Sequence, residues 1–216
     1  MLRQLSSRER VITSLNHKEP DMMPIDFGST EVTSITRIAY TKLREYLGLG
    51  VDPKLSISNR IEDTVYPKED FSRYYQVDFR PVTKKSPWKS KAREMPDDSF
   101  YDEYNIHWKK ILYYYDAVER PLSGISLPNL DDAVWPDPYD KGRVEGLKEE
   151  VDKIRETTDC AIVVDIMCEG PFEMSCMLRG YDEFPMDLIS NPKFAMRCWI
   201  KSPKPILYYG IHFYLQ

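Results

Sequence analysis

The chain has 216 residues, of which 42% are hydrophobic and 30% are charged, and its formal net charge is −5. This composition is typical of a globular protein with one core or two small ones, and it excludes general disorder. A mildly acidic chain lacks the excess of basic residues that binding to nucleic acid or to an anionic membrane surface requires. We therefore expect neither as a partner.

Targeting signals and membrane spans are not apparent in the sequence. The first four residues lead into a charged segment, and no apolar run approaches the ~20 residues of a membrane helix. We therefore expect a cytoplasmic protein. The four cysteines (Cys160, Cys168, Cys176 and Cys198) form no C-x-x-C pair and have no nearby histidine at zinc-ligand spacing. We expect free thiols and no metal ligands, with a disulfide or a metal as the alternative.

The amino-terminal segment predicts a helix followed by a short strand. Ser6 and Glu9 have the spacing of a capping box, and apolar residues at helical spacing follow up to residue 15. Pro20 ends this helix. The residues at 24–27 then read as a short strand.

A second helix is predicted over residues 35–47, where apolar side chains recur on one face and Gly48 suits the position after its end. The following region is less regular. We expect a short helix within 67–75 and a strand over 77–82, where apolar and polar residues alternate.

The middle of the chain is rich in aromatic and β-branched residues. Segments 106–108 and 113–115 are predicted to belong to paired strands. We expect the aromatic residues to serve in packing and His107 to be structural rather than a base. The basic segment 84–96 is expected to be a solvated loop, with an anion-binding gate as the alternative.

The last part predicts a helix–strand–helix–helix order. An amphipathic helix over 144–154 precedes an apolar strand over 160–164, which reads like a buried strand of a parallel sheet. A loop over 165–170 leads to a helix over 172–179, and Asn191 is expected to cap another. The alternation of helices and strands predicts an α/β fold with a parallel sheet.

Five blocks of the sequence resemble, in the same order, the uroporphyrinogen decarboxylase superfamily, which includes corrinoid-linked methyltransferases. The first block is SSRERVITSLNHKEPDMMPIDFG, and the other four lie at 46–49, 77–82, 135–147 and 169–192. The resemblance implies an α/β fold that is a partial (β/α)8 TIM barrel, with its site at the carboxyl ends of the strands.

The resemblance places two loops at the mouth of that barrel, where a small-molecule substrate would bind. Asp26 is the candidate catalytic residue, either orienting a substrate donor or acting as an acid or base. The alternative is that Asp26 caps the turn that follows it. The substrate-binding candidates are Asp26, Phe27, Gly28, Asp165, Met167, Glu169 and Phe172.

Two departures argue against porphyrinogen decarboxylation. Decarboxylases of the superfamily carry an arginine-rich loop after the first strand, whereas residues 28–33 here contain no arginine and include Glu31. A polycarboxylated substrate needs fixed cations, because burying unpaired charge is unfavourable. A tyrosine of those enzymes is also replaced by Cys176. For these reasons a decarboxylase-type carboxy-lyase is the alternative function and not the leading one.

The leading expectation is a parent enzyme on the methyltransferase-like side of the superfamily. That branch activates a thiol on zinc and works with a corrinoid protein, so the resemblance implies zinc and a corrinoid protein for the intact parent. The His-x-Cys ligand spacing is absent here, and we expect no cofactor in this chain. A third reading is a non-catalytic fragment or interaction module.

The resemblance covers residues 1–198 as the amino-terminal part of a barrel domain and fades into a divergent tail at 199–216. The tail is expected to be out of frame, with a short protein that closes its own fold as the alternative. A partial barrel exposes open strand edges, so we expect reduced or no activity and association into oligomers or aggregates.

Overall fold

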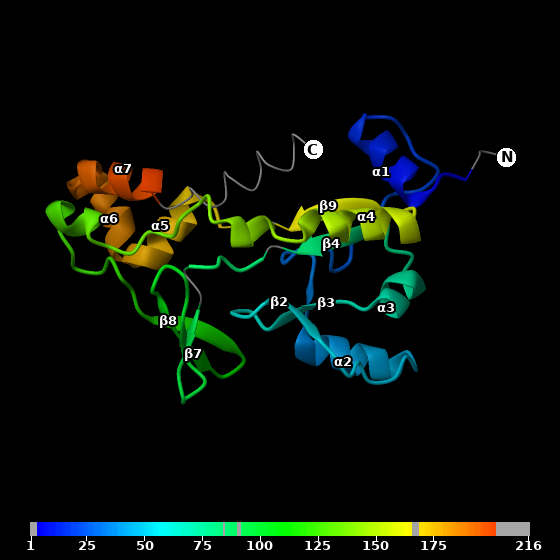
Figure 1. The fold of residues 1–216 in the computed structure, drawn as a ribbon, viewed down its shortest axis with the longest axis horizontal. Helices are drawn as coiled ribbons and strands as arrows, with labels where there is room; N and C mark the ends of the chain where they lie inside the picture. The colour runs from blue at the N-terminus through cyan, green and yellow to red at the C-terminus, as the bar shows by residue number, and fades with distance from the viewer. Residues whose placement is uncertain (1–3, 84, 90–91, 166–168, 202–216) are drawn as a thin grey trace. The chain divides into compact units, whose positions relative to one another are not determined.

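Figure 1 shows the fold in a computed structural model, which describes residues 4–83, 85–89, 92–165 and 169–201. The chain divides into two compact units, and each is described by itself. The first comprises Met1–Lys84 and Glu145–Ile166, and the second comprises Lys85–Val144 and Met167–Gln216. The fold is mixed α/β, and the sheets formed by the described residues are small and do not close into a barrel.

The first unit opens with α1 (Ser7–Leu15), whose capping box is confirmed. The Glu9 amide donates to the Ser6 hydroxyl at 3.3 Å, and the Ser6 amide donates to the Glu9 carboxylate at 3.0 Å. These two bonds satisfy donors that the first helical turn leaves without intrahelical partners.

The predicted strand over 24–27 is wrong, because this segment has no regular strand structure. Pro24 has no amide proton, and the next amide, that of Ile25, donates to the Asp78 carboxylate at 2.8 Å rather than to a backbone carbonyl. One backbone bond remains, from the Asp78 amide to the Ile25 carbonyl at 2.8 Å. The segment is thus held beside Asp78 by one side-chain bond and one backbone bond.

The middle of the first unit is a three-stranded antiparallel sheet in the order β1-β3-β2, with two helices beside it. Its core contains Tyr40, Val65 and Phe71, all fully buried. Gly48 has φ +69° after the second helix, as predicted for the position after a helix end. The elements are β1 (Ile35–Thr36), α2 (Arg37–Tyr46), β2 (Ser56–Asn59), β3 (Thr64–Tyr66) and α3 (Glu69–Tyr74).

The first unit also contains a parallel pair, β4 (Phe79–Thr83) and β9 (Ala161–Asp165), in which Phe79 lies opposite Ala161 and Thr83 opposite Asp165. The predicted parallel character of the 160–164 strand is confirmed, although its side chains beyond Ala161 are half-buried up to Val164. The preceding helix, α4 (Leu147–Thr157), packs against β4. It begins three residues later than predicted, because Gly146 has φ +71° and cannot extend the helix.

The second unit contains an antiparallel sheet in the order β5-β6-β7-β8, of which β7 and β8 form the green hairpin in Figure 1. The predicted pairing of the two aromatic segments is confirmed, since Ile111 lies opposite Tyr114 and Lys110 opposite Tyr115. The expected basic loop contributes the first of these strands. The strands are β5 (Arg93–Glu94), β6 (Phe100–Tyr101), β7 (His107–Ile111) and β8 (Tyr114–Glu119).

Three helices complete the second unit: α5 (Pro171–Arg179), α6 (Glu183–Ser190) and α7 (Pro192–Lys201). Gly180 ends α5 with φ +125°, in agreement with its predicted place after that helix. Two short 3-10 helices, η1 (Leu127–Asp131) and η2 (Lys141–Val144), precede them in the chain. α7 continues through residue 201, and the rest of the predicted divergent tail lies outside the described residues.

Candidate functional site

Asp26 lies in a tight turn of the first unit. Its Oδ1 accepts hydrogen bonds from the Ser29 amide at 3.2 Å and from the Ser29 hydroxyl. This is the geometry expected of the turn-capping alternative. Its Oδ2 accepts no hydrogen bond from the residues that the structure describes, and the side chain is half-buried. One carboxylate oxygen therefore fixes the turn while the other remains available.

Phe27 and Gly28 support that turn through packing. The Phe27 ring meets the Phe71 ring edge to face at 5.2 Å and the Tyr75 ring at 5.4 Å. Gly28 has φ +83°, and a Cβ there would collide with the Pro67 ring. The position therefore requires glycine for both its conformation and its space. Phe27 and Gly28 thus fix the backbone that carries Asp26.

The loop after this turn is closed by its own hydrogen bonds. The Gly28 amide donates to the Thr33 carbonyl at 2.8 Å, and the two hydroxyls of Thr30 and Thr33 lie 2.9 Å apart. Glu31 is 5% exposed and accepts a hydrogen bond from the Asn59 amide group at 3.3 Å. The one acid of the loop is therefore held inside the first unit.

The carboxyl ends of β4 and β9 lie side by side in the first unit, because Thr83 and Asp165 are partners in the parallel register. The Thr83 amide donates to the Glu150 carboxylate of α4 at 3.4 Å. Asp165 is thus placed at the edge where a parallel sheet binds its ligands. The predicted Met167 lies outside the described residues.

The remaining two candidates, Glu169 and Phe172, belong to the second unit. Glu169 Oε2 is buried and accepts no hydrogen bond from the described part of the chain. Phe172 is half-exposed and meets the Phe184 ring at 5.9 Å. Asp26, Phe27 and Gly28 therefore lie in one turn of the first unit, whereas Glu169 and Phe172 belong to the second unit.

A buried polar network of the second unit was not predicted. Asp102 accepts hydrogen bonds from the Tyr104 and Ile106 amides and from the Trp108 indole, each at 2.9 Å. Burial raises the pKa of the Asp102 carboxyl to about 6 despite these donors. Arg143 pairs with Glu103 beside it. The sequence signal was an Asp whose side chain can accept a hydrogen bond from the backbone amide two residues later. This pattern also occurs in ordinary loops.

His107 contributes to packing, in line with the sequence expectation. Its ring stacks on Tyr101 with centroids 4.3 Å apart and an angle of 11°. Its Nε2 lies 2.9 Å from the Ser99 hydroxyl, and its Nδ1 lies 3.5 Å from Glu119. Ser99 is 1% exposed, so this group offers no accessible nucleophile.

The described thiols fit zinc poorly. Cys160, Cys176 and Cys198 are buried free cysteines. Burial raises the pKa of the Cys176 thiol and raises the pKa of the Cys198 thiol to about 11, whereas a zinc ligand is a thiolate. Within the described ranges, no three Cys, His, Asp or Glu side chains are grouped to hold a metal ion.

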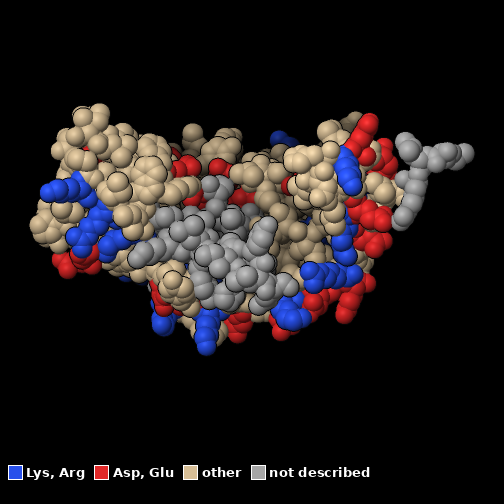
Figure 2. Space-filling model, turned by 90° about the horizontal axis from the view of Figure 1, so that it is seen from above, with Lys and Arg blue, Asp and Glu red and all other residues tan. Residues whose placement is uncertain are grey.

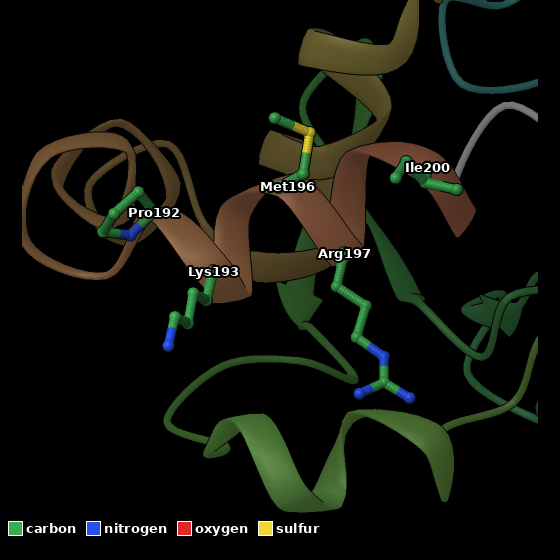
Figure 3. Close-up of a pocket in the computed structure, with 5 residues that line it drawn as sticks. All are labelled: Pro192, Lys193, Met196, Arg197 and Ile200. Carbon is green, nitrogen blue, oxygen red and sulfur yellow. The ribbon is translucent and has the colours of Figure 1, made fainter.

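An apolar hollow lies on the outer face of α7 (Figure 3). Its lining includes Met196 and Ile200, which are 63% and 58% exposed, with Lys193 and Arg197 beside them. Figure 2 shows mostly uncharged atoms over α6 and α7, with a group of basic side chains at their margin. None of the helices among the described residues combines the length and apolarity needed to cross a bilayer.

Comparisons with protein-family models, with curated proteins and with solved structures gave no match for this chain.

Proposed function

We propose that the chain is part of a uroporphyrinogen decarboxylase-like enzyme that binds a small-molecule substrate at the carboxyl ends of β4 and β9. The observation that carries the proposal is the parallel register of these strands, with α4 preceding β9 and packed on β4. Strand, helix and parallel strand are the repeating unit of a (β/α)8 barrel, and here the segment from β5 to η2 is inserted between the strand β4 and the helix α4. The five sequence blocks support the same assignment.

The chemistry that we favour is methyl transfer rather than decarboxylation. The loop at 28–33 offers no arginine to a carboxylated substrate, and its Glu31 is buried against Asn59. Zinc and a corrinoid protein would act with the intact parent enzyme, since the described thiols of this chain are poor zinc ligands. This chain alone is expected to have low activity.

Asp26 is the residue that we assign to this chemistry on the strength of the sequence resemblance, although its neighbour Ile25 is bonded to Asp78, just before β4. Its Oδ1 is committed to Ser29, and its Oδ2 accepts nothing from the described residues. A carboxylate held in this way can orient a donor group of the substrate or move a proton. The two roles of Asp26, capping and catalysis, are compatible because they use different oxygens.

An assay of the full chain tests this function. The chain is incubated with methylcobalamin, a thiol and added zinc, and separately with uroporphyrinogen. We expect slow methyl transfer above the protein-free rate and no release of carbon dioxide. Asp26→Asn should lower the methyl-transfer rate to near the protein-free rate, since a general acid or base is then lost. The amide oxygen keeps the bonds to Ser29, so the turn should survive.

Asp159→Asn is the matched control, since Asp159 is an exposed acid of the same unit and the change in charge is identical. This control should retain the wild-type rate. Release of carbon dioxide from uroporphyrinogen would overturn the methyl-transfer assignment. An unchanged rate in Asp26→Asn would show that Asp26 caps the turn and has no catalytic role.

A second candidate function is a non-catalytic interaction module. The observation that favours it is the apolar hollow on α7, where Met196 and Ile200 are more than half exposed. Exposed apolar surface of this kind is typical of association sites. Measurements of the oligomeric state test this candidate.

A further inference from the structure

A polar hollow of about 310 Å³ lies within the first unit. Val77, which precedes β4, and Cys160, which precedes β9, are among the residues that line it. The hollow therefore lies at the amino-terminal ends of these strands. Its volume is near the lower end of the range for small-molecule sites.

The lining of this hollow consists mainly of hydrogen-bond donors. Residues from the start of α1, from α3 and from β4 converge on it, and the described lining contains no Asp or Glu. Guanidinium groups donate only, whereas hydroxyls and amides can donate and accept. The polar residues on which the argument rests are Ser7, Ser72, Gln76, Arg10, Arg73 and Arg80.

Ser72 is a largely buried residue in the lining of this hollow. The residue is 6% exposed, and its amide donates to the Lys68 carbonyl at 3.0 Å within α3. Its hydroxyl makes no hydrogen bond with the residues that the structure describes. The Ser72 oxygen is not among the fully buried side-chain atoms that lack a partner, so it remains accessible to solvent. This hydroxyl is therefore available to donate to a ligand in the hollow.

Arg73 and Arg80 share a single carboxylate. Arg73 Nε donates to Glu69 at 2.9 Å, and Arg80 donates to the same carboxylate through Nε at 2.8 Å and Nη2 at 3.0 Å. Burial raises the pKa of the Glu69 carboxyl, but hydrogen bonds from both arginines outweigh this and lower the pKa overall. Two guanidinium charges thus face one carboxylate.

The terminal nitrogens of Arg73 are unused. Neither Nη1 nor Nη2 of this residue donates to any group in the described part of the chain. Arg10, in contrast, makes four hydrogen bonds, to Asp21, Asp78 and the Leu5 carbonyl. The excess positive charge therefore lies beside Arg73 and Ser72 rather than beside Arg10.

We propose that this hollow binds the phosphate group of a small ligand through Arg73, Ser72 and Gln76. A guanidinium, a hydroxyl and an amide supply donors from different directions, which suits a tetrahedral oxyanion with several acceptor oxygens. Ser72, Arg73 and Gln76 lie within one short stretch of chain, so the local fold of α3 sets their spacing. The proposal does not depend on the chemistry at the opposite strand ends.

Inorganic phosphate is the probe for this site. Thermal unfolding of the full chain is measured across a phosphate series, with sodium chloride added to hold ionic strength constant. We expect a saturable rise in Tm, as for any ligand that binds the folded state. Arg73→Gln should raise the half-saturating phosphate concentration about tenfold or more, and Ser72→Ala should raise it several-fold.

Arg155→Gln is the matched control. Arg155 is an exposed arginine on α4 in the same unit, and the change in charge is identical. The side chain of Arg73 is 72% exposed, and it pairs with Glu69 one turn earlier in α3, so both variants should fold. Phosphate should stabilise the control as it stabilises the wild type.

Three results would overturn the proposal. One is a phosphate effect no larger than that of chloride at equal ionic strength. Another is an equal loss of the effect in Arg73→Gln and Arg155→Gln, which would indicate a general charge effect. The third is stabilisation by acetate as strong as that by phosphate, since a planar carboxylate should use fewer of these donors.

Discussion

At the scale of single residues, Gly28 controls the turn that carries Asp26. Its φ of +83° is unfavourable for any side chain, and a Cβ would also collide with Pro67. Gly28→Ala should therefore lower the free energy of unfolding by roughly 2 to 5 kcal/mol, from backbone strain and overpacking together. Chemical denaturation measures this change.

Gly50→Ala separates the two causes. Gly50 also has a positive φ, of +69°, but a Cβ there would meet nothing within 4 Å. Its substitution should cost about 1 to 2 kcal/mol, from conformation alone. An equal loss in the two variants would show that Pro67 does not crowd Gly28.

Asp102 should give the folded chain a specific pH dependence. Burial raises its pKa to about 6, against about 3.9 in an unfolded chain. Between about pH 4 and pH 6 the folded chain keeps a proton that the unfolded chain releases. The free energy of unfolding should therefore fall as pH rises through this window, by about 3 kcal/mol in total.

Asp102→Asn tests this assignment by urea denaturation across the same pH window. The amide cannot titrate, so the fall between about pH 4 and pH 6 should disappear from the variant. Its absolute stability should also drop, because Asn cannot accept from three donors equally well. An unchanged slope in the variant would assign the pH dependence to another group.

At the scale of elements, Phe71 joins α3 to α2 and to the turn before Gly28. Its ring is fully buried and lies 5.1 Å from Tyr40 and 5.2 Å from Phe27. Phe71→Ala should cost about 3 to 5 kcal/mol of unfolding free energy. Tyr74→Ala, on the exposed side of the same helix, should cost less than about 1 kcal/mol. Similar losses would contradict this core.

Elements with local signals were predictable from the sequence. The capping box at Ser6, the glycine after α2 and the alternating residues of the β7–β8 hairpin each fix structure within a few residues. The strand predicted at 24–27 failed because its amide is taken by Asp78, more than fifty residues away. α6 was missed because Pro185 reads as a break, although proline is tolerated in a first helical turn.

The candidate site was predictable in the same partial way. Asp26 and Gly28 are neighbours in the sequence and were predicted from one short motif, and the structure places both in one turn. The polar hollow beside Ser72 and Arg73 has no such local signature, because α1, α3 and β4 each contribute to it. Only the folded chain brings those segments to one place.

At the scale of the whole molecule, the chain should self-associate. β4 and β9 pair only with each other among the described residues, and Met196 and Ile200 on α7 are exposed. Sedimentation should show weight-average mass rising with concentration, and Met196→Lys with Ile200→Lys should reduce this rise if α7 carries the contact. Persistence of the rise in the variant would assign it to the strand edges. A monomer at all concentrations would contradict the prediction.

The parallel pairing of β4 with β9 is the central structural claim, and cysteine cross-linking tests it most directly. Val82 lies opposite Val164, where Cα atoms about 4.8 Å apart suit a disulfide. Val82→Cys with Val164→Cys should form this bond on oxidation, identified by mass spectrometry of the linked peptides. Phe79→Cys with Val164→Cys should not, because three residues along a strand place the pair about 10 Å apart. A link between positions 79 and 164, with none between 82 and 164, would contradict the parallel register and the barrel assignment that rests on it.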